Sequence, residues 1–245
     1  MTTQTTATGK IFTEILRWFT IQKDFFGKFI YKIIRQNKLK EFTGSGVEYW
    51  EQRHEKFGAR SVVNLAHPEE EFEKVTRMQK ERLFTILKKQ LSGNENLILD
   101  FGCGPGRFTG GLADSINGKA IGVEPSRHLL SLAPKNPNVE YRIMKEGEIP
   151  AETASIDVVW VCLVLSIIVD ERILRNTINE VDRVLKKDGS LFLVANTTDG
   201  KQDLEYIKFR SVQKYQEYFN FLNLRHISDY FDLGERISIM AGKKI

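Results

Sequence analysis

The chain has 245 residues, 41% of them hydrophobic, which suffices for one well-packed α/β domain with an appendage and excludes a second full domain. Its two cysteines, Cys103 and Cys162, have the spacing of neither a metal site nor a redox pair, so we expect a reducing compartment and no bound metal. A membrane-spanning run of about eighteen apolar residues and a signal-peptide pattern are both absent, so the sequence predicts a cytoplasmic protein.

The first 46 residues differ from the rest of the chain. Residues 1–9 are small and polar and are predicted to be disordered. Residues 10–40 have the period of an amphipathic helix and carry eight Lys or Arg residues against Glu14 and Asp24, a charge of +6. The rest of the chain therefore sums to −2, which disfavours nucleic-acid binding outside this segment. Its apolar side must meet the domain itself, a second subunit in a homodimer, or an anionic membrane surface as a peripheral contact.

Residues 44–46, Gly-Ser-Gly, are predicted to be a hinge between an extension (1–46) and a single domain (47–245). Residues 47–58 are predicted to form a short helix, and residues 67–90 a long charged helix with one apolar stripe. His54 and His67 belong to this region. A lone histidine is more often structural than catalytic, but either one is a candidate base.

The most informative stretch is residues 96–109, NLILDFGCGPGRFT. An apolar run ends at Asp100 and is followed by three alternating glycines, which predicts a buried strand, a tight turn and the start of a helix. A dinucleotide loop needs a third glycine three residues after the second, and neither register provides one, since Arg107 and Thr109 stand at those places. The carboxylate of Asp100 at the strand end favours a ligand that carries a positive charge.

A second element supports a nucleoside-containing ligand. Residues 119–124, KAIGVE, are predicted to be the next parallel strand, and their last residue, Glu124, stands about twenty residues after the turn, where a carboxylate can accept both hydroxyls of a ribose. The acid-x-Gly-x-Gly-x-Gly spacing, together with this acid, resembles motif I of the class I S-adenosylmethionine (SAM)-dependent methyltransferases, in particular those that act on small molecules. The resemblance covers nearly all of the chain from residue 96 to the C-terminus.

This resemblance implies SAM as the cofactor and a set of residues around it. The glycines would carry the amino-acid end of SAM, Glu124 the ribose and Leu129 one face of the adenine, while Tyr49 and Arg53, with Trp50 nearby, would cover the methionine end. Lys145 stands where relatives place an acid that faces the adenine amino group, so Glu146 or a backbone group would serve instead. The full set of expected cofactor-binding residues is Tyr49, Arg53, Asp100, Gly102, Cys103, Gly104, Arg107, Glu124, Pro125, Leu129, Glu146, Gly147, Cys162 and Leu163.

The second half of the chain continues the alternation of strands and helices. Strands are predicted over 139–144 and 156–162, followed by a helix over 170–186, a turn at Asp188-Gly189, a strand to residue 194 and a closing hairpin of 224–231 and 236–241. Of the aromatic residues at 206–221, most are expected in the core and one or two in an acceptor pocket. The sequence therefore predicts a Rossmann-like, doubly wound α/β fold, a seven-stranded sheet with a closing antiparallel hairpin and an N-terminal helical extension.

The expected reaction is transfer of the SAM methyl group to an O or N nucleophile of a small-molecule or lipid-like acceptor. Residues 162–168 lack the Asn-Pro-Pro-Tyr or Asp-Pro-Pro-Tyr motif, which disfavours DNA adenine and protein glutamine acceptors. His54, His67 and Asp170 are the candidate bases, with Glu48 as a further one. A SAM-binding interaction subunit without activity and an RNA methyltransferase are the alternatives. We expect residues 10–40 to act as a lid on the acceptor side, with dimerisation and membrane contact left open.

Overall fold

The computed structural model describes residue 42 and residues 46–198, 200 and 203–245. The predicted tail, the amphipathic helix of residues 10–40 with its expected contacts, and the first two residues of the glycine hinge lie outside the described residues. The unit described below runs from Phe42 to Ile245.

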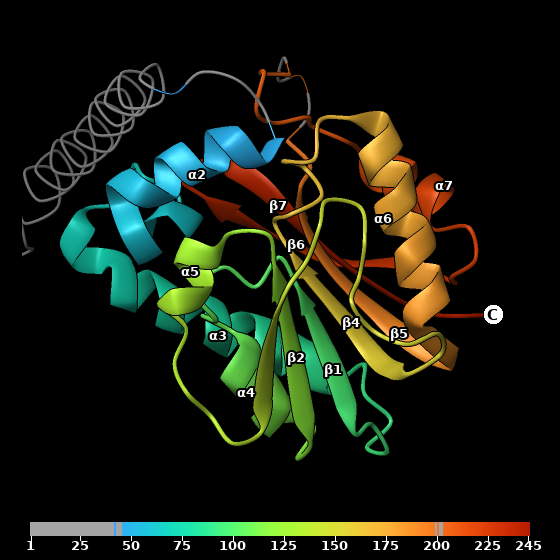
Figure 1. Ribbon diagram of the computed structural model, residues 1–245. Helices are drawn as coiled ribbons and strands as arrows, with labels where there is room; N and C mark the ends of the chain where they lie inside the picture. The colour runs from blue at the N-terminus through green and yellow to red at the C-terminus, as the bar shows by residue number, and fades with distance from the viewer. Residues whose placement is uncertain (1–41, 43–45, 199, 201–202) are drawn as a thin grey trace, which may run out of the picture. The chain divides into compact units, whose positions relative to one another are not determined.

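Seven strands form one sheet in the order β3-β2-β1-β4-β5-β7-β6 (Figure 1). Strands β1 to β5 pair in parallel, and β7 pairs antiparallel with both β5 and β6. This confirms the predicted seven-stranded sheet with its closing hairpin. The elements are α2 Gly46–Phe57, η1 Gly58–Val62, η2 Glu69–Glu71, α3 Phe72–Lys88, β1 Leu97–Phe101, α4 Thr109–Ser115, β2 Lys119–Glu124, α5 Arg127–Ser131, β3 Val139–Ile143, β4 Ile156–Cys162, α6 Glu171–Val184, β5 Leu185–Asn196, α7 Val212–Tyr218, β6 Arg225–Asp232 and β7 Glu235–Lys243.

Each face of the sheet has its own apolar core. On one face, α6 and α7 bury side chains such as Leu174, Ile178 and Tyr215 against the strands. On the other face, α3 and α4 bury Leu83 and Leu112, among others, against strands that include β4 and β7. The central strand β4 is apolar along almost its whole length because both of its faces are covered, as the sequence predicted.

Three predicted boundaries were wrong. The long helix expected over 67–90 begins at Phe72, because Pro68 leads into a short 3-10 turn. The first crossover helix, for which the residues after the turn predict the range 107–116, begins only at Thr109, because the chain is still turning at Gly106 with φ +72°. Strand β5 already begins at Leu185, and the expected turn at Asp188 (φ +61°) is an irregularity within this strand, opposite a register shift in β4.

The closing hairpin has a two-residue turn, in which glycine suits the second position. Leu233 and Gly234 are the two residues between β6 and β7, and both have positive φ, +48° and +83°. Two consecutive positive φ values are typical of the type I′ turn, whose twist matches that of the strands it joins.

The carboxyl ends of β1 to β5 share one edge of the sheet, and this is the edge at which α/β sheets bind ligands. Helix α2 lies at this edge (Figure 1), and its first residue, Gly46, lies next to the side chain of Glu146, which follows β3.

Within the part of the chain that is described, no helix is long and apolar enough to cross a membrane. Among the same residues, no cluster of His, Cys, Asp or Glu is arranged to hold a metal ion, and both cysteines are free.

Candidate functional site

The glycine turn between β1 and α4 is held against the end of β2. The amides of Gly102 and Cys103 both donate to the carbonyl oxygen of Val123, at 2.9 and 3.1 Å. Gly102 has φ +67°, and a Cβ atom there would lie 2.5 Å from a methyl carbon of Val164. A side chain at this position would therefore be strained and would collide with the residue that covers the turn.

The carboxylate of Glu124 joins the end of β2 to the glycine turn. Its Oε2 accepts a hydrogen bond from the Gly104 amide at 3.0 Å, and its Oε1 accepts one from the Ser126 amide at 3.2 Å. Burial raises the pKa of Glu124 to about 7, although both of these hydrogen bonds act to lower it. Each oxygen has a lone pair to spare, so the carboxylate can still accept hydrogen bonds from a ligand's hydroxyl groups.

Asp100 is a second buried carboxylate beside the turn. It is 2% exposed, and its Oδ2 accepts a hydrogen bond from the Thr109 hydroxyl at 2.7 Å. Burial raises the pKa of Asp100 to about 7, and the negative charge of Glu124 adds to this, while the Thr109 hydrogen bond and the positive charge of Arg107 oppose it. Among the described residues, neither carboxylate has an ion-pair partner within 4.0 Å. A ligand with a positive charge would supply the missing compensation.

Helix α2 and the turn η1 form a cover over this region. Arg53 on α2 is buried and donates to the backbone carbonyls of Ser61 and Val63, at 2.9 and 3.0 Å, so that it fixes the η1 segment. Between them, a methyl carbon of Val62 lies 3.1 Å from where a Cβ of Gly104 would be. Arg107, which follows the turn, donates to the Val62 carbonyl at 3.3 Å. The cover thus contacts the glycine turn at Gly104 and is hydrogen-bonded to Arg107, the residue that follows the turn.

Tyr49 lies deeper in this cover than its polar side chain would suggest. It is fully buried, and its ring stacks on that of Tyr206 with 4.5 Å between the ring centroids. Trp50 packs edge-on against Tyr49 and lies under the guanidinium of Arg53, at 4.7 Å. The structure therefore brings the expected aromatic pair next to a segment that follows β5, and Tyr206 is one of the aromatics proposed for an acceptor pocket.

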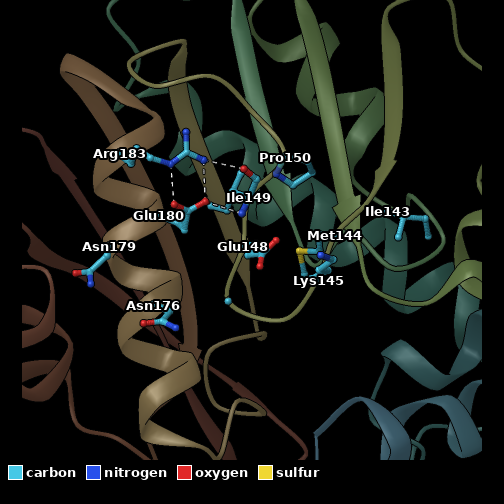
Figure 2. A pocket seen from close by; sticks show the side chains of 11 residues that line it. Ile143, Met144, Lys145, Glu148, Ile149, Pro150, Asn176, Asn179, Glu180 and Arg183 are labelled. Atoms are coloured by element: carbon cyan, nitrogen blue, oxygen red, sulfur yellow. Dashed lines mark hydrogen bonds and ion pairs between the residues drawn. The ribbon is translucent and has the colours of Figure 1, made fainter.

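The loop after β3 carries the residues expected near the adenine. Glu146 is exposed, and its side chain lies beside Gly46, the first residue of α2. Gly147 has φ +77° and lies against α6. Figure 2 shows how α6 holds the following residues: Glu180 accepts from the Ile149 amide at 2.8 Å, and Arg183 donates to the Ile149 carbonyl at 2.8 Å. On the side of β2, the end of the Leu129 side chain on α5 lies 3.8 Å from where a Cβ of Gly104 would be. Pro125 lies between β2 and α5.

The β4–α6 loop, residues 163–170, faces the glycine turn from the β4 side. It follows Cys162, the half-buried last residue of β4, and starts at Leu163 in a left-handed conformation with φ +62°, which costs about 1 kcal/mol for a residue other than glycine. The amide of Leu163 donates to the carbonyl of Val194 at 2.8 Å, and the carbonyl of Ser166 accepts from the Lys208 amide at 2.7 Å. The side chains from Leu163 to Val169 are apolar except that of Ser166.

The three candidate bases lie on different elements. Burial lowers the pKa of His54 to about 4, helped by the charges of Arg53 and His128, so this histidine is neutral at physiological pH. His67 lies 2.7 Å from Asp232, the last residue of β6. Asp170 is the N-cap of α6, where hydrogen bonds from the amides of Ile173 and Arg172 lower its pKa. Their catalytic roles, and that of exposed Glu48, remain predictions.

Several site residues have no sequence signal of their own. Val62 and Val164 cover the glycine turn from two sides, and Thr109 holds Asp100, but each is an ordinary residue in its local pattern. Ser126 is the N-cap of α5, where its hydroxyl accepts a hydrogen bond from the Leu129 amide, and its own amide donates to Glu124. The contacts of Val62 and Val164 depend on the tertiary approach of distant segments.

Comparison with known proteins identifies the central part of the chain. A family model described as a methyltransferase domain matches residues 98–189. A methyltransferase-like protein of Schizosaccharomyces pombe is 34% identical over 115 residues, which are 46% of this chain and 43% of that protein. A relative from Dictyostelium discoideum is 33% identical over 81 residues, 33% of this chain and 30% of that protein. The matches thus span less than half of the curated relatives' length.

Solved structures share the fold at low identity. A SAM-dependent methyltransferase of Thermotoga maritima, described as a possible histamine N-methyltransferase, has a TM-score of 0.55 at 18% identity and covers 72% of this chain and 94% of its own. Phosphoethanolamine N-methyltransferase 2 of Haemonchus contortus has a TM-score of 0.57 at 15% identity, over 67% of this chain and 52% of its own. The family match and the curated relatives thus show a methyltransferase domain in the central part of the chain, and the solved structures share the fold of SAM-dependent methyltransferases.

Proposed function

We propose that this protein transfers the methyl group of SAM to an O or N nucleophile of a small-molecule or lipid-like acceptor. The observation that carries the proposal is the pair of buried carboxylates, Asp100 and Glu124, on either side of the glycine turn, without an ion-pair partner in the described part of the chain. SAM, the cofactor of this family, has a cationic amino-acid end and a ribose with two hydroxyl groups, and it matches this arrangement.

Each part of the chain would then have a defined task. Glu124 would accept from the ribose hydroxyls, and the backbone of Gly102, Cys103 and Gly104 would lie along the amino-acid end, near Asp100. Leu129 and the loop with Glu146 and Gly147 would enclose the adenine. Pro125, Arg107, Cys162, Leu163, Tyr49 and Arg53 would complete the cofactor-binding wall.

The chemistry of bound SAM is that of an activated methyl donor, whose carbon–sulfur bond breaks as the electron pair returns to sulfur and the acceptor's lone pair forms the new bond. The protein's contribution is then to align the acceptor and exclude water. The apolar β4–α6 loop and the Tyr49–Tyr206 stack suit these tasks. An amine acceptor would lose its proton to solvent, while an alcohol would need one of the candidate bases.

The acceptor class is supported by two structural relatives. One is described as a possible histamine N-methyltransferase, and the other was solved with phosphomonomethylethanolamine and S-adenosylhomocysteine. Both names point to small amines, so we place small amines first among the proposed acceptors of this chain.

The test is isotopic labelling. The protein is incubated with trideuteromethyl-SAM and, in separate reactions, with small-molecule, lipid and RNA extracts, and the products are analysed by mass spectrometry for a mass increase of about 17, the replacement of one hydrogen by a CD3 group. A labelled small molecule or lipid, formed in step with S-adenosylhomocysteine, is the expected result. Binding of SAM with no labelled product in small-molecule, lipid or RNA fractions would contradict the proposal and favour a SAM-binding subunit. Label found only in RNA would favour the other alternative.

A further inference from the structure

Arg210 is a buried cation that contacts the β4–α6 loop at several points. It is 6% exposed, and its Nη1 donates to the carbonyl oxygen of Leu165 at 3.0 Å. Its Nη2 donates to the carbonyl oxygen of Ile168 at 3.1 Å and to Oε1 of Glu171 at 2.9 Å. One side chain therefore connects the middle of the loop, its end and the first residue of α6.

Glu171 is itself fixed, so it can orient the guanidinium. Its second oxygen accepts a hydrogen bond from the Tyr218 hydroxyl at 2.8 Å, and the Lys208 ammonium lies 3.6 Å from its first oxygen. The planar fork of an arginine can satisfy two carbonyls and a carboxylate at once, which the single ammonium of a lysine does poorly. The geometry is therefore specific for arginine.

The loop that Arg210 holds is in contact with the proposed cofactor site. Its second residue, Val164, lies against Gly102, so closely that a Cβ there would come within 2.5 Å of it. The loop begins in the strained conformation of Leu163, and such a conformation persists only where surrounding contacts impose it. The carbonyl bonds from Arg210 are two of those contacts.

We propose that Arg210 is a positioning residue for methyl transfer, which holds residues 163–170 so that Val164 closes on the glycine turn and the loop presents one fixed apolar surface to the acceptor. The inference rests on the proposed function, because it assigns the acceptor to this side of the turn. Arg210 acts through the loop and has no contact with the reacting atoms in this account.

The test compares Arg210→Gln and Arg210→Lys with a matched control, Lys244→Gln. The ammonium of Lys244 also binds two backbone carbonyls, those of Asp182 and Leu185, and an Asp182 carboxylate oxygen at 2.7 Å. Leu185 is the first residue of β5, so this cluster lies at the opposite edge of the sheet from the site. The control removes a comparable set of bonds without touching the β4–α6 loop.

The first readout is amide hydrogen exchange of a peptide that covers residues 163–170, in SAM-saturated protein. Because hydrogen bonds to a charged side chain are stronger than those between neutral groups, we expect exchange at least about tenfold faster in Arg210→Gln, with partial rescue in Arg210→Lys and no change in Lys244→Gln. If Arg210→Gln and Lys244→Gln exchange alike in this peptide, the proposal is overturned, whatever their activities are.

The second readout is S-adenosylhomocysteine formation over a dilution series of the small-molecule extract. We expect the half-saturating extract concentration to rise at least about tenfold in Arg210→Gln while the Kd for SAM changes by less than about threefold, a split that lost stability alone does not produce. An unchanged extract dependence relative to Lys244→Gln would also overturn the proposal. If the wild type forms no product, the proposed function fails, and the exchange readout still decides whether Arg210 holds the loop.

Discussion

Oε2 of Glu124 accepts a hydrogen bond from the Gly104 amide at 3.0 Å, across twenty residues of sequence. The bond joins the end of β2 to the middle of the glycine turn, so the carboxylate and the turn form one rigid surface. Because the turn and the carboxylate are held together before any ligand binds, a nucleoside would bind there with little reorganisation of the protein.

Glu124→Ala should weaken SAM binding by about 1.5 to 3 kcal/mol, roughly ten- to a hundredfold in Kd, because two ribose hydroxyls lose a charged acceptor. Isothermal titration calorimetry measures this. Glu140→Ala is the control, since Glu140 is an exposed residue of the edge strand β3, paired with Arg142 at 2.7 Å. Unchanged affinity in a folded Glu124→Ala protein would refute the ribose assignment.

Asp100→Asn should separate stability from binding. The carboxylate is buried without an ion-pair partner in the described residues, so replacing it with a neutral amide should raise the melting temperature of the ligand-free protein at pH 8. The same change should weaken SAM, because the cationic end of the ligand loses its counter-charge. Thermal melts with and without SAM test both effects, and a variant that is less stable and binds SAM normally would show that the carboxylate is structural.

The two raised pKa values predict opposite pH trends for folding and binding. Asp100 and Glu124 have pKa values of about 7 in the folded protein, above their ordinary values, so between about pH 4 and pH 7 the native state holds more protons than the unfolded state. Their contribution to the unfolding free energy therefore falls as the pH rises to 7 and is constant above it.

SAM affinity should rise over the same range, because the ligand binds the ionised carboxylates. We expect a Kd at least about tenfold lower at pH 8 than at pH 6, with a shallower dependence in Asp100→Asn. Calorimetric titrations at pH 6, 7 and 8 would measure it. A Kd that is flat across these pH values would mean that neither carboxylate changes its ionisation when SAM binds.

Gly102→Ala should be more damaging than the same change at another glycine with positive φ. Gly102 has φ +67° and Val164 in the way of a Cβ, whereas Gly93 has φ +90° and no atom within 4 Å of its added Cβ. Both variants have a strain of about 1 kcal/mol, and only Gly102→Ala must also displace Val164. Urea unfolding and SAM titration should show the larger loss of stability, and any loss of binding, in Gly102→Ala alone. Equal behaviour would mean that the contact between Val164 and the turn is unimportant.

Local patterns predicted the elements that define the fold. The strands β2 and β4 were predicted with the bounds they have, because an apolar run between polar residues is unambiguous in a parallel sheet. The glycine turn and Glu124 were predicted from spacing, and the structure joins them through the Gly104 amide. The start of α3 at Phe72 depends on a single turn after Pro68. The spacing of apolar residues along a helix does not locate its first residue so closely.

Contacts between distant segments could not be predicted from the sequence. Arg210 reaches Leu165 across 45 residues, and Arg107 reaches Val62 across the same number. Nothing in the local sequence distinguishes Arg210 from a solvated surface residue, and the resemblance that placed Arg107 near the cofactor did not predict its bond to Val62, because the carbonyls that both arginines bind become neighbours only when the chain folds. The same holds for the stack of Tyr49 on Tyr206, which places an α2 aromatic beside a segment that follows β5.

The central claim is that the glycine turn and its two carboxylates form a SAM site, and competitive ligand binding tests it most directly. SAM, S-adenosylhomocysteine, NADH and ATP are titrated separately into the full-length wild-type protein at pH 8 in a calorimeter. The account predicts that SAM and S-adenosylhomocysteine bind at one site per chain, and that NADH and ATP bind at least about a hundredfold more weakly because their phosphates meet Asp100 and Glu124. Binding of NADH or ATP in preference to SAM would contradict it.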